Sequence, residues 1–324
     1  MVSYIGSDMG KVVIAGRDCV TNQQINSIVV DDRFSSEFVY YSLSTRKREI
    51  RHQAAGGSAV PILNKSDFSC LEITLPPLSE QKRVAHILGT LDDKIELNRR
   101  MNATLESMAR ALFQSWFVDF DPVKRNAEGG ESRPEDALFP NSFEESEMGE
   151  IPKGWRVMKV GDFVDRLSVG QKYDQKTVFP VGSVPVLDQG KSGVIGFHDN
   201  KPGVNATLDR PVAVFANHTC YMRLITFPFS TIQNVLPFVG KDADTLWCYY
   251  ATEGRLTFSE YKGHWPDFVI QKTPKPPREL TVEFGRLVKP LVTRIRNNEE
   301  ESRVLATLRD TLLPKLLSGD LNVP

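Results

Sequence analysis

The chain has 324 residues, of which 40% are hydrophobic and 25% are charged, an ordinary composition for a protein with a folded core. The formal net charge is −1, so any DNA-binding face must be a local concentration of Lys and Arg. No apolar run reaches the roughly 18 residues that a membrane span needs, and no export signal opens the chain. The cysteines are scattered without a CxxC pair. We therefore expect a cytoplasmic protein with two globular domains and an elongated element.

Residues 1–75 have the pattern of an α/β domain. We expect these elements in order: a strand over 11–15, a strand over 25–30, a helix over 36–53, a glycine-containing loop over 54–58 and a strand over 71–75. Pro76-Pro77 ends the last strand, and Ser79 is a suitable N-cap for a long helix that runs to Phe117. At about 1.5 Å per residue, such a helix spans on the order of 55–60 Å.

An apolar ladder with alternating spacings of four and three residues runs through this helix and recurs 200 positions later. Its rungs are Val84, Leu88, Leu91, Ile95, Asn98, Asn102, Leu105, Ala109, Leu112 and Trp116, and then Phe284, Val288, Leu291, Ile295, Asn298, Ser302, Leu305, Arg309, Leu312 and Leu316. Apolar rungs match apolar rungs and polar rungs match polar ones, except at Ala109 and Arg309. Sustained spacing of this kind is typical of helices that wind around each other. The sequence therefore predicts a duplicated unit built around an internal coiled coil.

The ladder alone leaves the direction of the second helix open. In an antiparallel pair, Asn102 would face Asn298 and Asn98 would face Ser302, while Trp116 meets Phe284 and Val84 meets Leu316. A buried Asn layer of this kind can fix the register of a coiled coil. A parallel pair would match Asn98 with Asn298. Leu91 opposite Arg309 is the poor match in the antiparallel version.

Between the two helices, residues 121–150 are acidic and rich in Gly and Pro, which predicts a linker partly held by Leu138, Phe139 and Phe143. A second α/β segment follows from Ile151, with strands expected over 184–187, 194–197, 212–215 and 221–225. The duplication extends into it, since 21–25 matches 231–235, Tyr40-Tyr41 matches Tyr249-Tyr250, and Gly56-Gly57 falls opposite 262–265. Met1 then aligns near Arg210, so the first copy has no counterpart of residues 151–209.

Several long stretches closely resemble the specificity subunits of type I restriction-modification enzymes. They are residues 75–82 (LPPLSEQK), 91–100 (LDDKIELNRR), 111–123 (ALFQSWFVDFDPV), 143–155 (FEESEMGEIPKGW) and 312–321 (LLPKLLSGDL). The resemblance covers essentially the whole chain. It implies two α/β (α+β) target-recognition domains, each followed by a long spacer helix, with the two helices packed as an antiparallel coiled coil.

The resemblance also implies partners and boundaries. Each recognition domain would read one half of a split site in double-stranded DNA, and the helices would set the spacing and dock methyltransferase subunits and ATP-driven restriction subunits. The expected segments are a partial first recognition domain (1–75), a first spacer helix (76–120), a linker (121–150), a second recognition domain (151–275), and a second spacer helix with a tail (276–324). The first domain begins in mid-domain compared with the family. A misplaced start, a decayed gene, self-association or a second polypeptide that completes the domain are all open explanations.

No catalytic or cofactor motif emerges from the sequence. Gly190-Lys-Ser192 resembles a phosphate loop, but Pro185 stands where that motif needs glycine. Asp67 with Glu80 and Lys82 loosely fits a metal-dependent nuclease, although helix capping explains Glu80 better. No Asn/Asp-Pro-Pro-aromatic motif for amino methylation is present. We therefore expect a non-catalytic subunit without metal or cofactor. A DNA-binding scaffold without restriction partners, or a defective specificity subunit, is the alternative.

Base reading needs amide, guanidinium and other polar groups at loop ends, because these side chains match the edges of bases. In the second domain the candidates are Lys172, Tyr173, Gln189, Lys191, Ser192, His198, Asn217, His218, Tyr221, Arg223, Lys262, His264 and Trp265. In the first domain they are Arg17, Asn22, Gln23, Arg51, His52 and Ser58. We assign Asn98, Asn102, Asn298 and Ser302 to the register of the coiled coil.

Overall fold

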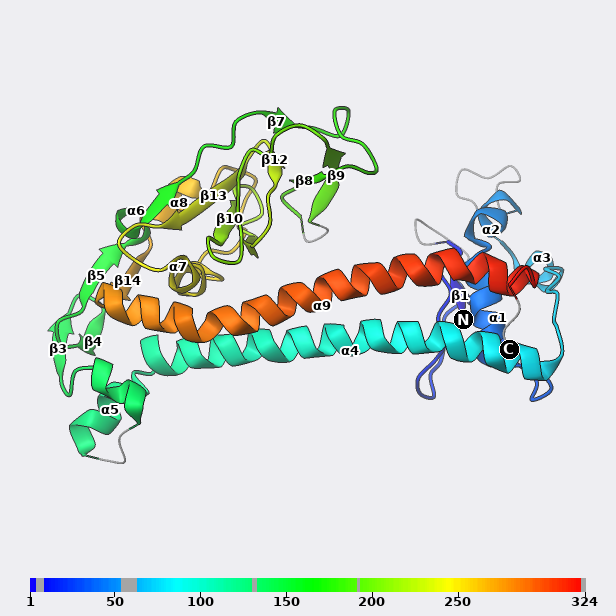
Figure 1. Ribbon diagram of the computed structural model, residues 1–324, viewed down its shortest axis with the longest axis horizontal. Helices are drawn as coiled ribbons and strands as arrows, with labels where there is room; N and C mark the ends of the chain where they lie inside the picture. Colours follow the sequence, from blue (N-terminus) through cyan, green and yellow to red (C-terminus); the bar gives the residue numbers. More distant parts are fainter. Residues whose placement is uncertain (4–8, 54–62, 130–132, 191–192, 322–324) are drawn as a thin grey trace. The chain divides into compact units, whose positions relative to one another are not determined.

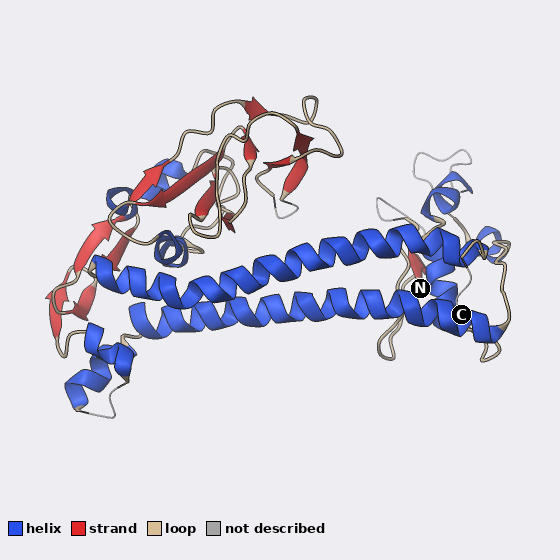
Figure 2. Ribbon diagram, in the orientation of Figure 1, coloured by secondary structure: helices blue, strands red, loops and turns tan. Residues whose placement is uncertain are grey.

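A computed structural model describes residues 1–3, 9–53, 63–129, 133–190 and 193–321, and the chain folds into two compact units. The first unit comprises Met1–Arg100 with Asn298–Pro324, and the second comprises Met101–Asn297. Both units contain helices and strands, as Figure 2 shows. Within the described residues, no helix is long and apolar enough to cross a membrane.

The first unit is a small α/β assembly packed on two helical segments. Its elements are β1 (Val2–Ser3), β2 (Ile25–Asn26), α1 (Ser36–Ser44), α2 (Lys47–Gln53), α3 (Lys65–Ser69), the first part of α4 (Leu78–Phe117) and the last part of α9 (Arg278–Ser318). β1 and β2 pair antiparallel. Val39 and Leu43 of α1 are buried with Val2 of β1 in one apolar cluster, so α1 covers the short strand pair.

Several expectations for this unit are wrong in detail. The strand expected over 25–30 is reduced to β2, and that over 11–15 to a single bridge between Val2 and Val12. Residues 71–75 are not a strand: Leu71, Ile73 and Leu75 pack on the core, but no strand pairs with this segment among the described residues. The alternating apolar pattern of this segment therefore reflects an extended chain that packs on the core and does not pair in a sheet. The loop over 54–58 lies outside the described residues.

The helix expected over 36–53 is split into α1 and α2. Ser44 Oγ donates to Tyr40 O at 2.7 Å, and Thr45 Oγ1 donates to Ser42 O at 2.8 Å. Such side-chain bonds compete with the helical hydrogen-bond ladder. The N-cap of α1 is Ser35, whose Oγ accepts from Phe38 N. At the next long helix, α4 begins at Leu78, so Ser79 lies inside the first turn and is not its cap.

The helices α4 and α9 pack antiparallel, as Figure 1 shows for the cyan and orange-red ribbons. In the first unit, Val84 and Leu88 near the start of α4 share an apolar cluster with Leu316 near the end of α9. In the second unit, Phe113 near the end of α4 packs edge-to-face on Phe284 near the start of α9, with ring centroids 5.7 Å apart. The first residues of each helix therefore meet the last residues of the other. This confirms the antiparallel coiled coil.

Asn98 contacts Ser302, as the antiparallel register predicts, and Asn102 contacts the carbonyl of Ile295. Asn98 is fully buried, and its Nδ2 donates to Glu301 Oε2 at 2.8 Å and to Ser302 Oγ at 3.3 Å. Asn102 Nδ2 lies 3.4 Å from the carbonyl oxygen of Ile295. A shifted register would bury these amides against apolar rungs, and a buried amide without partners is costly. We propose that the asparagine rungs hold the register.

Arg309, the exception in the ladder, has a partner of its own. Arg309 Nη1 donates to Asp92 Oδ1 at 2.6 Å, and Tyr41 Oη of α1 donates to Asp92 Oδ2 at 2.7 Å. The positions equivalent to Arg309 and Asp92 in the second unit are Ala109 and Val292, and both are buried in an apolar core. The ladder is therefore mismatched at this rung because the first unit has a polar cluster around Arg309 and Asp92, where the second unit has an apolar contact.

The second unit contains two four-stranded sheets and a strand pair that leads into α9. In addition to parts of α4 and α9, its elements are α5 (Asp121–Glu128), the 3-10 helix η1 (Pro134–Leu138), β3 (Phe143–Ser146), β4 (Gly149–Pro152), β5 (Arg156–Lys159), α6 (Val160–Phe163), β6 (Val164–Arg166), β7 (Lys172–Tyr173), β8 (Val184–Leu187), β9 (Val194–His198), β10 (Val212–Ala216), β11 (Met222–Ile225), β12 (Ser230–Ile232), β13 (Val235–Gly240), α7 (Thr245–Thr252), α8 (Trp265–Val269) and β14 (Lys272–Lys275).

One sheet has the order β11-β10-β13-β6 and is antiparallel throughout. The other has the order β7-β12-β8-β9, in which β12 runs parallel to both its neighbours. The four strands expected here are present, with end shifts of one residue. β10 is buried along its whole length. Phe215 on one face packs with Trp247 of α7 and Phe268 of α8, and Val212 and Val214 on the other face belong to a second apolar cluster.

The described residues of the segment 121–150, which we expected to be a partly held linker, include α5, η1 and the β3–β4 hairpin. Arg125 Nη2 contacts Asp136 Oδ1 at 2.6 Å, which fastens α5 to η1, and Phe139 is buried against Trp116. Phe143 begins the β3–β4 hairpin, whereas Leu138 is exposed. These residues form a small folded motif in spite of their acidic composition. The ion pair between Arg125 and Asp136 joins its two helices.

The same contact joins one domain helix to the spacer helix in both units. In the first, the backbone N–H of Ser35, the N-cap of α1, donates to the buried Gln81 Oε1 at 3.0 Å. In the second, the N–H of Asp244, the N-cap of α7, donates to the buried Thr281 Oγ1 at 3.0 Å. Gln81 and Thr281 are 200 positions apart, so the duplication extends to how each domain is attached to its helix.

Replacing Gln81 with leucine should lower the stability of the first unit by about 2–3 kcal/mol. The change leaves the Ser35 N–H and the Pro76 carbonyl, to which Gln81 Nε2 donates at 2.7 Å, without partners in a buried site. Chemical denaturation would measure the loss. Gln24→Leu, the same change at an exposed position of the first unit, is the control. Equal, small effects of both variants would contradict the buried attachment.

Candidate nucleic-acid interface

Three segments of the second unit lie together and carry most of the predicted site residues. They are the loop between β8 and β9 (188–193), the turn between β10 and β11 (217–221) and the segment before α8 (258–265), which we call the loop cluster. Residues 191 and 192 of this set, the candidates Lys191 and Ser192, lie outside the described residues. The cluster forms because β-strands from both sheets deliver their connecting loops to one place.

The β8–β9 loop is tied to the β10–β11 turn through Gln189. The backbone N–H of His218 donates to Gln189 Oε1 at 2.9 Å, and Thr219 Oγ1 donates to the Gln189 carbonyl at 2.7 Å. Gln189 and His218 are half-buried, and Thr219 is exposed. Part of the hydrogen-bonding capacity of Gln189 is therefore used to join the two loops.

The β10–β11 turn is also tied to the segment before α8. Asn217 Oδ1 accepts from Trp265 N at 2.8 Å, and the Asn217 carbonyl accepts from His264 N at 2.8 Å. His264 is buried, and its Nε2 lies 3.0 Å from the Glu260 carbonyl. Asn217 and His264 thus shape the cluster from inside. Trp265 is half-buried and packs on Phe215 and Phe268 of the core.

Tyr173 and His198 are internal and do not face solvent, contrary to what we expected of base readers. Their rings stack with centroids 4.1 Å apart. His198 Nδ1 accepts from Asn200 N at 3.0 Å, so Nε2 carries the proton in the neutral ring and can donate to Ser230 Oγ at 2.9 Å. Both nitrogens of His198 are therefore occupied. Burial lowers the pKa of this imidazole.

The second unit should lose stability as the pH falls below the ordinary histidine pKa of 6.5. The pKa of His198 in the folded state lies below its pKa in the unfolded state. The stability that the neutral imidazole contributes is therefore fully present above the unfolded-state pKa, and it is lost as the pH falls toward the folded-state pKa. Protonation at Nδ1 also removes the acceptor of the Asn200 N–H. Urea unfolding between pH 7.5 and 5.5 measures the slope, which should shrink in His198→Gln. An unchanged slope in that variant would assign the acid sensitivity to other groups.

The segment before α8 presents exposed aromatic and basic side chains. Tyr261 is 82% exposed and Phe258 is 55% exposed, and the Tyr261 ring packs edge-on to His218 at 4.9 Å. Lys262 is exposed and contacts Glu260 at 2.9 Å and Asp267 at 3.2 Å, which raises its pKa. The search for polar loop residues missed both aromatics. Their alternation with Lys262 and Trp265 was the signal that could have found them.

A basic hollow adjoins the cluster where β6 leads into β7. It has a volume of about 390 Å³ and is lined by Arg166, Leu167, Ser168, Val169, Gly170 and Lys172. The Arg166 guanidinium lies 5.9 Å from the Trp265 ring centroid, which connects the hollow to the cluster. Within the described residues, neither Arg166 nor Lys172 forms an ion pair with a carboxylate. Both cations are therefore available to an anionic ligand.

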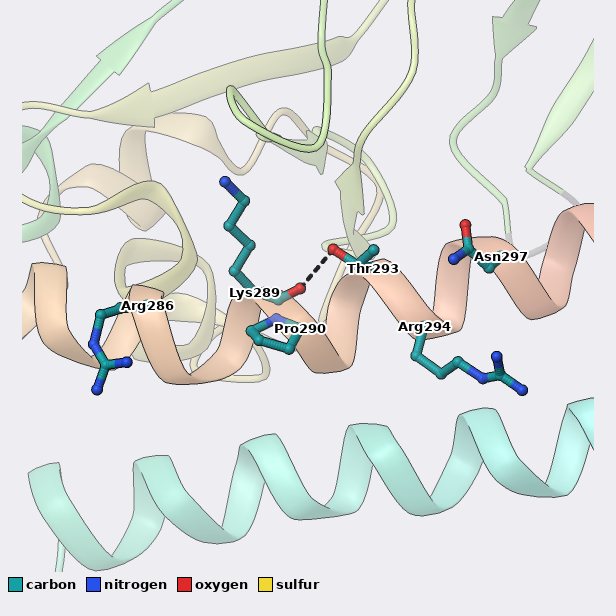
Figure 3. Close-up of a pocket in the computed structure, with 6 residues that line it drawn as sticks. All are labelled: Arg286, Lys289, Pro290, Thr293, Arg294 and Asn297. Atoms are coloured by element: carbon teal, nitrogen blue, oxygen red, sulfur yellow. Dashed lines mark hydrogen bonds between the residues drawn. The ribbon is translucent and has the colours of Figure 1, made fainter.

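A second hollow lies along α9 and is less suited to anions. Figure 3 shows its lining residues, Arg286, Lys289, Pro290, Thr293, Arg294 and Asn297, around a volume of about 440 Å³. Arg286 Nε contacts Glu283 at 2.8 Å and Lys289 Nζ contacts Asp209 at 2.6 Å. Nearby carboxylates thus offset most of the charge that the composition of this hollow suggests.

The candidates of the first unit are spread over two surface elements. Arg17, Asn22 and Gln23 are exposed before β2, where Asn22 Oδ1 accepts from Gln24 N at 3.0 Å. Arg51 and His52 are exposed on α2. Ser58 lies outside the described residues. Nothing in this unit joins these side chains into a cluster comparable with that of the second unit, as far as the described residues extend.

Known proteins that are similar to this chain include specificity subunits of type I restriction enzymes. Residues 1–107 match the type I restriction modification DNA specificity domain. The type I restriction enzyme MjaIX specificity subunit of Methanocaldococcus jannaschii is 27% identical over 345 residues, which cover 97% of this chain and 76% of that protein. Along nearly its whole length, this chain is therefore similar to specificity subunits of type I restriction-modification enzymes.

Two further proteins are similar to this chain. The HindI specificity subunit of Haemophilus influenzae is 23% identical over 388 residues, which cover 98% of this chain and 83% of that protein. The crystal structure of the S subunit from M. genitalium shares the fold with a TM-score of 0.56 at 18% identity, covering 97% of this chain and 81% of that one. The family resemblance read from the sequence is therefore confirmed, as is the fold class.

Proposed function

We propose that this specificity subunit selects DNA through the loop cluster of its second unit together with the hollow between Arg166 and Lys172. The observation that supports this proposal most strongly is that two kinds of groups lie close together. Amide, hydroxyl and aromatic groups lie on loops that hydrogen bonds join to each other, and beside them lie Arg166 and Lys172, which pair with no carboxylate among the described residues. Cations of this kind bind phosphates and set the orientation on the duplex, while groups on the loops reach base edges. The first unit would read the other half of a bipartite site.

Among the proposed base-reading residues we retain Lys172, Gln189, His218, Tyr221 and Lys262, and add Tyr261. Lys191 and Ser192 remain candidates by sequence, as do Arg17, Asn22, Gln23, Arg51 and Ser58 in the first unit. Tyr173, His198, Asn217, Arg223 and His264 are reassigned to shaping the loops, because they are buried or bonded internally.

Catalysis would come from partner subunits that dock on this chain. Within the described residues, no group of three His, Cys, Asp or Glu side chains is placed to hold a metal ion. We propose that methyltransferase subunits, and in the full complex restriction subunits, act on the DNA that this chain selects.

Co-expression with a type I methyltransferase subunit tests the proposal. The purified complex should transfer methyl groups to adenines at one bipartite sequence, and the methyltransferase alone should not. Binding should weaken steeply with salt, because phosphate contacts release counterions. Equal methylation by the methyltransferase without this chain, or methylation without sequence preference, would refute the proposed role.

A further inference from the structure

Arg223 on β11 points into the protein and not toward a ligand. Its Nη1 donates to the Gly193 carbonyl at 2.7 Å, and its Nη2 donates to the Asp188 carbonyl at 2.8 Å. Only 16% of its side chain is exposed, and the nearest carboxylate, Asp188, is 4.0 Å away. Burial lowers the pKa of this guanidinium. A base reader would need these same donors free at the surface.

The two carbonyls bound by Arg223 stand at the two ends of the β8–β9 loop. One planar guanidinium group therefore binds both ends of the loop. A lysine ammonium cannot form this pair of bonds with the same geometry. Inside the loop, Asp188 Oδ1 accepts from Gly190 N at 3.0 Å, and Gly193 has φ of +87°, a backbone angle that favours glycine. The bonds from His218 and Thr219 to Gln189 hold the outer side. The loop is thus fastened on two sides by the β10–β11 hairpin.

We infer that Arg223 is a positioning residue that holds residues 188–190 and 193 of the β8–β9 loop in place, and through them sets the sequence preference of the second unit, without touching DNA. The inference rests on the proposed function. In this view, the β10–β11 hairpin of one sheet supports the β8–β9 loop of the other sheet, which contacts the bases. Arg223 on one sheet then determines which groups the other sheet presents to the duplex.

The methylation pattern of the whole complex distinguishes positioning from base reading. In cells that carry the full chain and its methyltransferase, sequencing of methylated adenines gives both half-sites of the motif. With Arg223→Gln and Arg223→Lys, we expect discrimination at several positions of one half-site to fall roughly tenfold, about the size of one lost base contact. The other half-site should stay unchanged and acts as an internal control.

Two further variants distinguish the loss of loop positioning from a general folding defect. Thr219→Val removes the Oγ1 bond to Gln189 at an exposed position, so it should relax the same base positions to a smaller extent. Arg210→Gln removes an exposed arginine of the same unit and should leave the motif unchanged.

Three results would overturn the inference. Arg223→Lys could retain the wild-type motif, the loss could be confined to one guanine position, or both half-sites could fail while Thr219→Val remains wild type. Absence of any bipartite motif with the wild-type chain would instead refute the proposed function, and the inference with it.

Discussion

Replacing Phe284 with alanine should lower the free energy of unfolding of the second unit by about 4 kcal/mol. Phe284 is fully buried, and its ring meets Phe117 at 5.4 Å and Tyr250 at 5.7 Å, both edge-to-face. The loss combines removal of a buried aromatic side chain, the cavity that remains and the lost ring contacts. Chemical denaturation followed by tryptophan fluorescence would measure it.

Val282→Ala is the matched control for this change. Val282 lies on the same turn of α9 but is 43% exposed, so its truncation should alter stability by less than about 0.5 kcal/mol. If Phe284→Ala were as mild as Val282→Ala, the aromatic core that joins α4, α7 and α9 would not be the main support of this unit.

Neutralising Arg166 and Lys172 together should weaken DNA binding by the complex roughly tenfold to a hundredfold at about 0.1 M salt. Each cation is expected to neutralise one phosphate. The slope of log affinity against log salt should therefore become shallower by about 2, since each phosphate contact contributes roughly 0.9. Fluorescence anisotropy of labelled duplex DNA at several salt concentrations would measure both quantities.

The control for the double change is Arg286→Gln with Lys289→Gln in the hollow along α9. These two cations already contact Glu283 and Asp209, so their loss should change the salt slope little. A larger effect from this control pair than from Arg166 and Lys172 would move the phosphate-binding surface from the loop cluster to α9.

The coiled coil was predictable from the sequence because its core positions follow a local period. Val84, Leu88 and Phe284 are buried where the ladder puts them. The direction of the helices was not predictable, because Asn98 can face a polar rung in either direction. It is decided by contacts between distant segments, such as the pair of Arg309 with Asp92.

The strands of the second unit were also largely predictable, whereas those of the first were not. β8 and β10 are short apolar runs that find partners on both sides. Residues 71–75 have a similar pattern and pack on a core, but no strand lies beside them in the described chain. Strand formation depends on a neighbour that the local sequence does not specify.

The site was predictable as a set of loops but not residue by residue. Polar loop residues such as Gln189 and Lys262 were found by type and position. Burial of His198 and Arg223 depends on Ser230, on Asp188 and on Gly193, which are 30 or more positions away in sequence. Sequence spacing could not reveal that these two side chains point inward.

Exchange of residues 151–275 with the corresponding segment of a family member of different specificity tests the central claim most directly. Sequencing of methylated DNA from cells that carry the exchanged chain and its methyltransferase would report both half-sites. The account predicts that one half-site changes to that of the donor while the other half-site is retained. Retention of both original half-sites would show that this segment does not choose the DNA sequence.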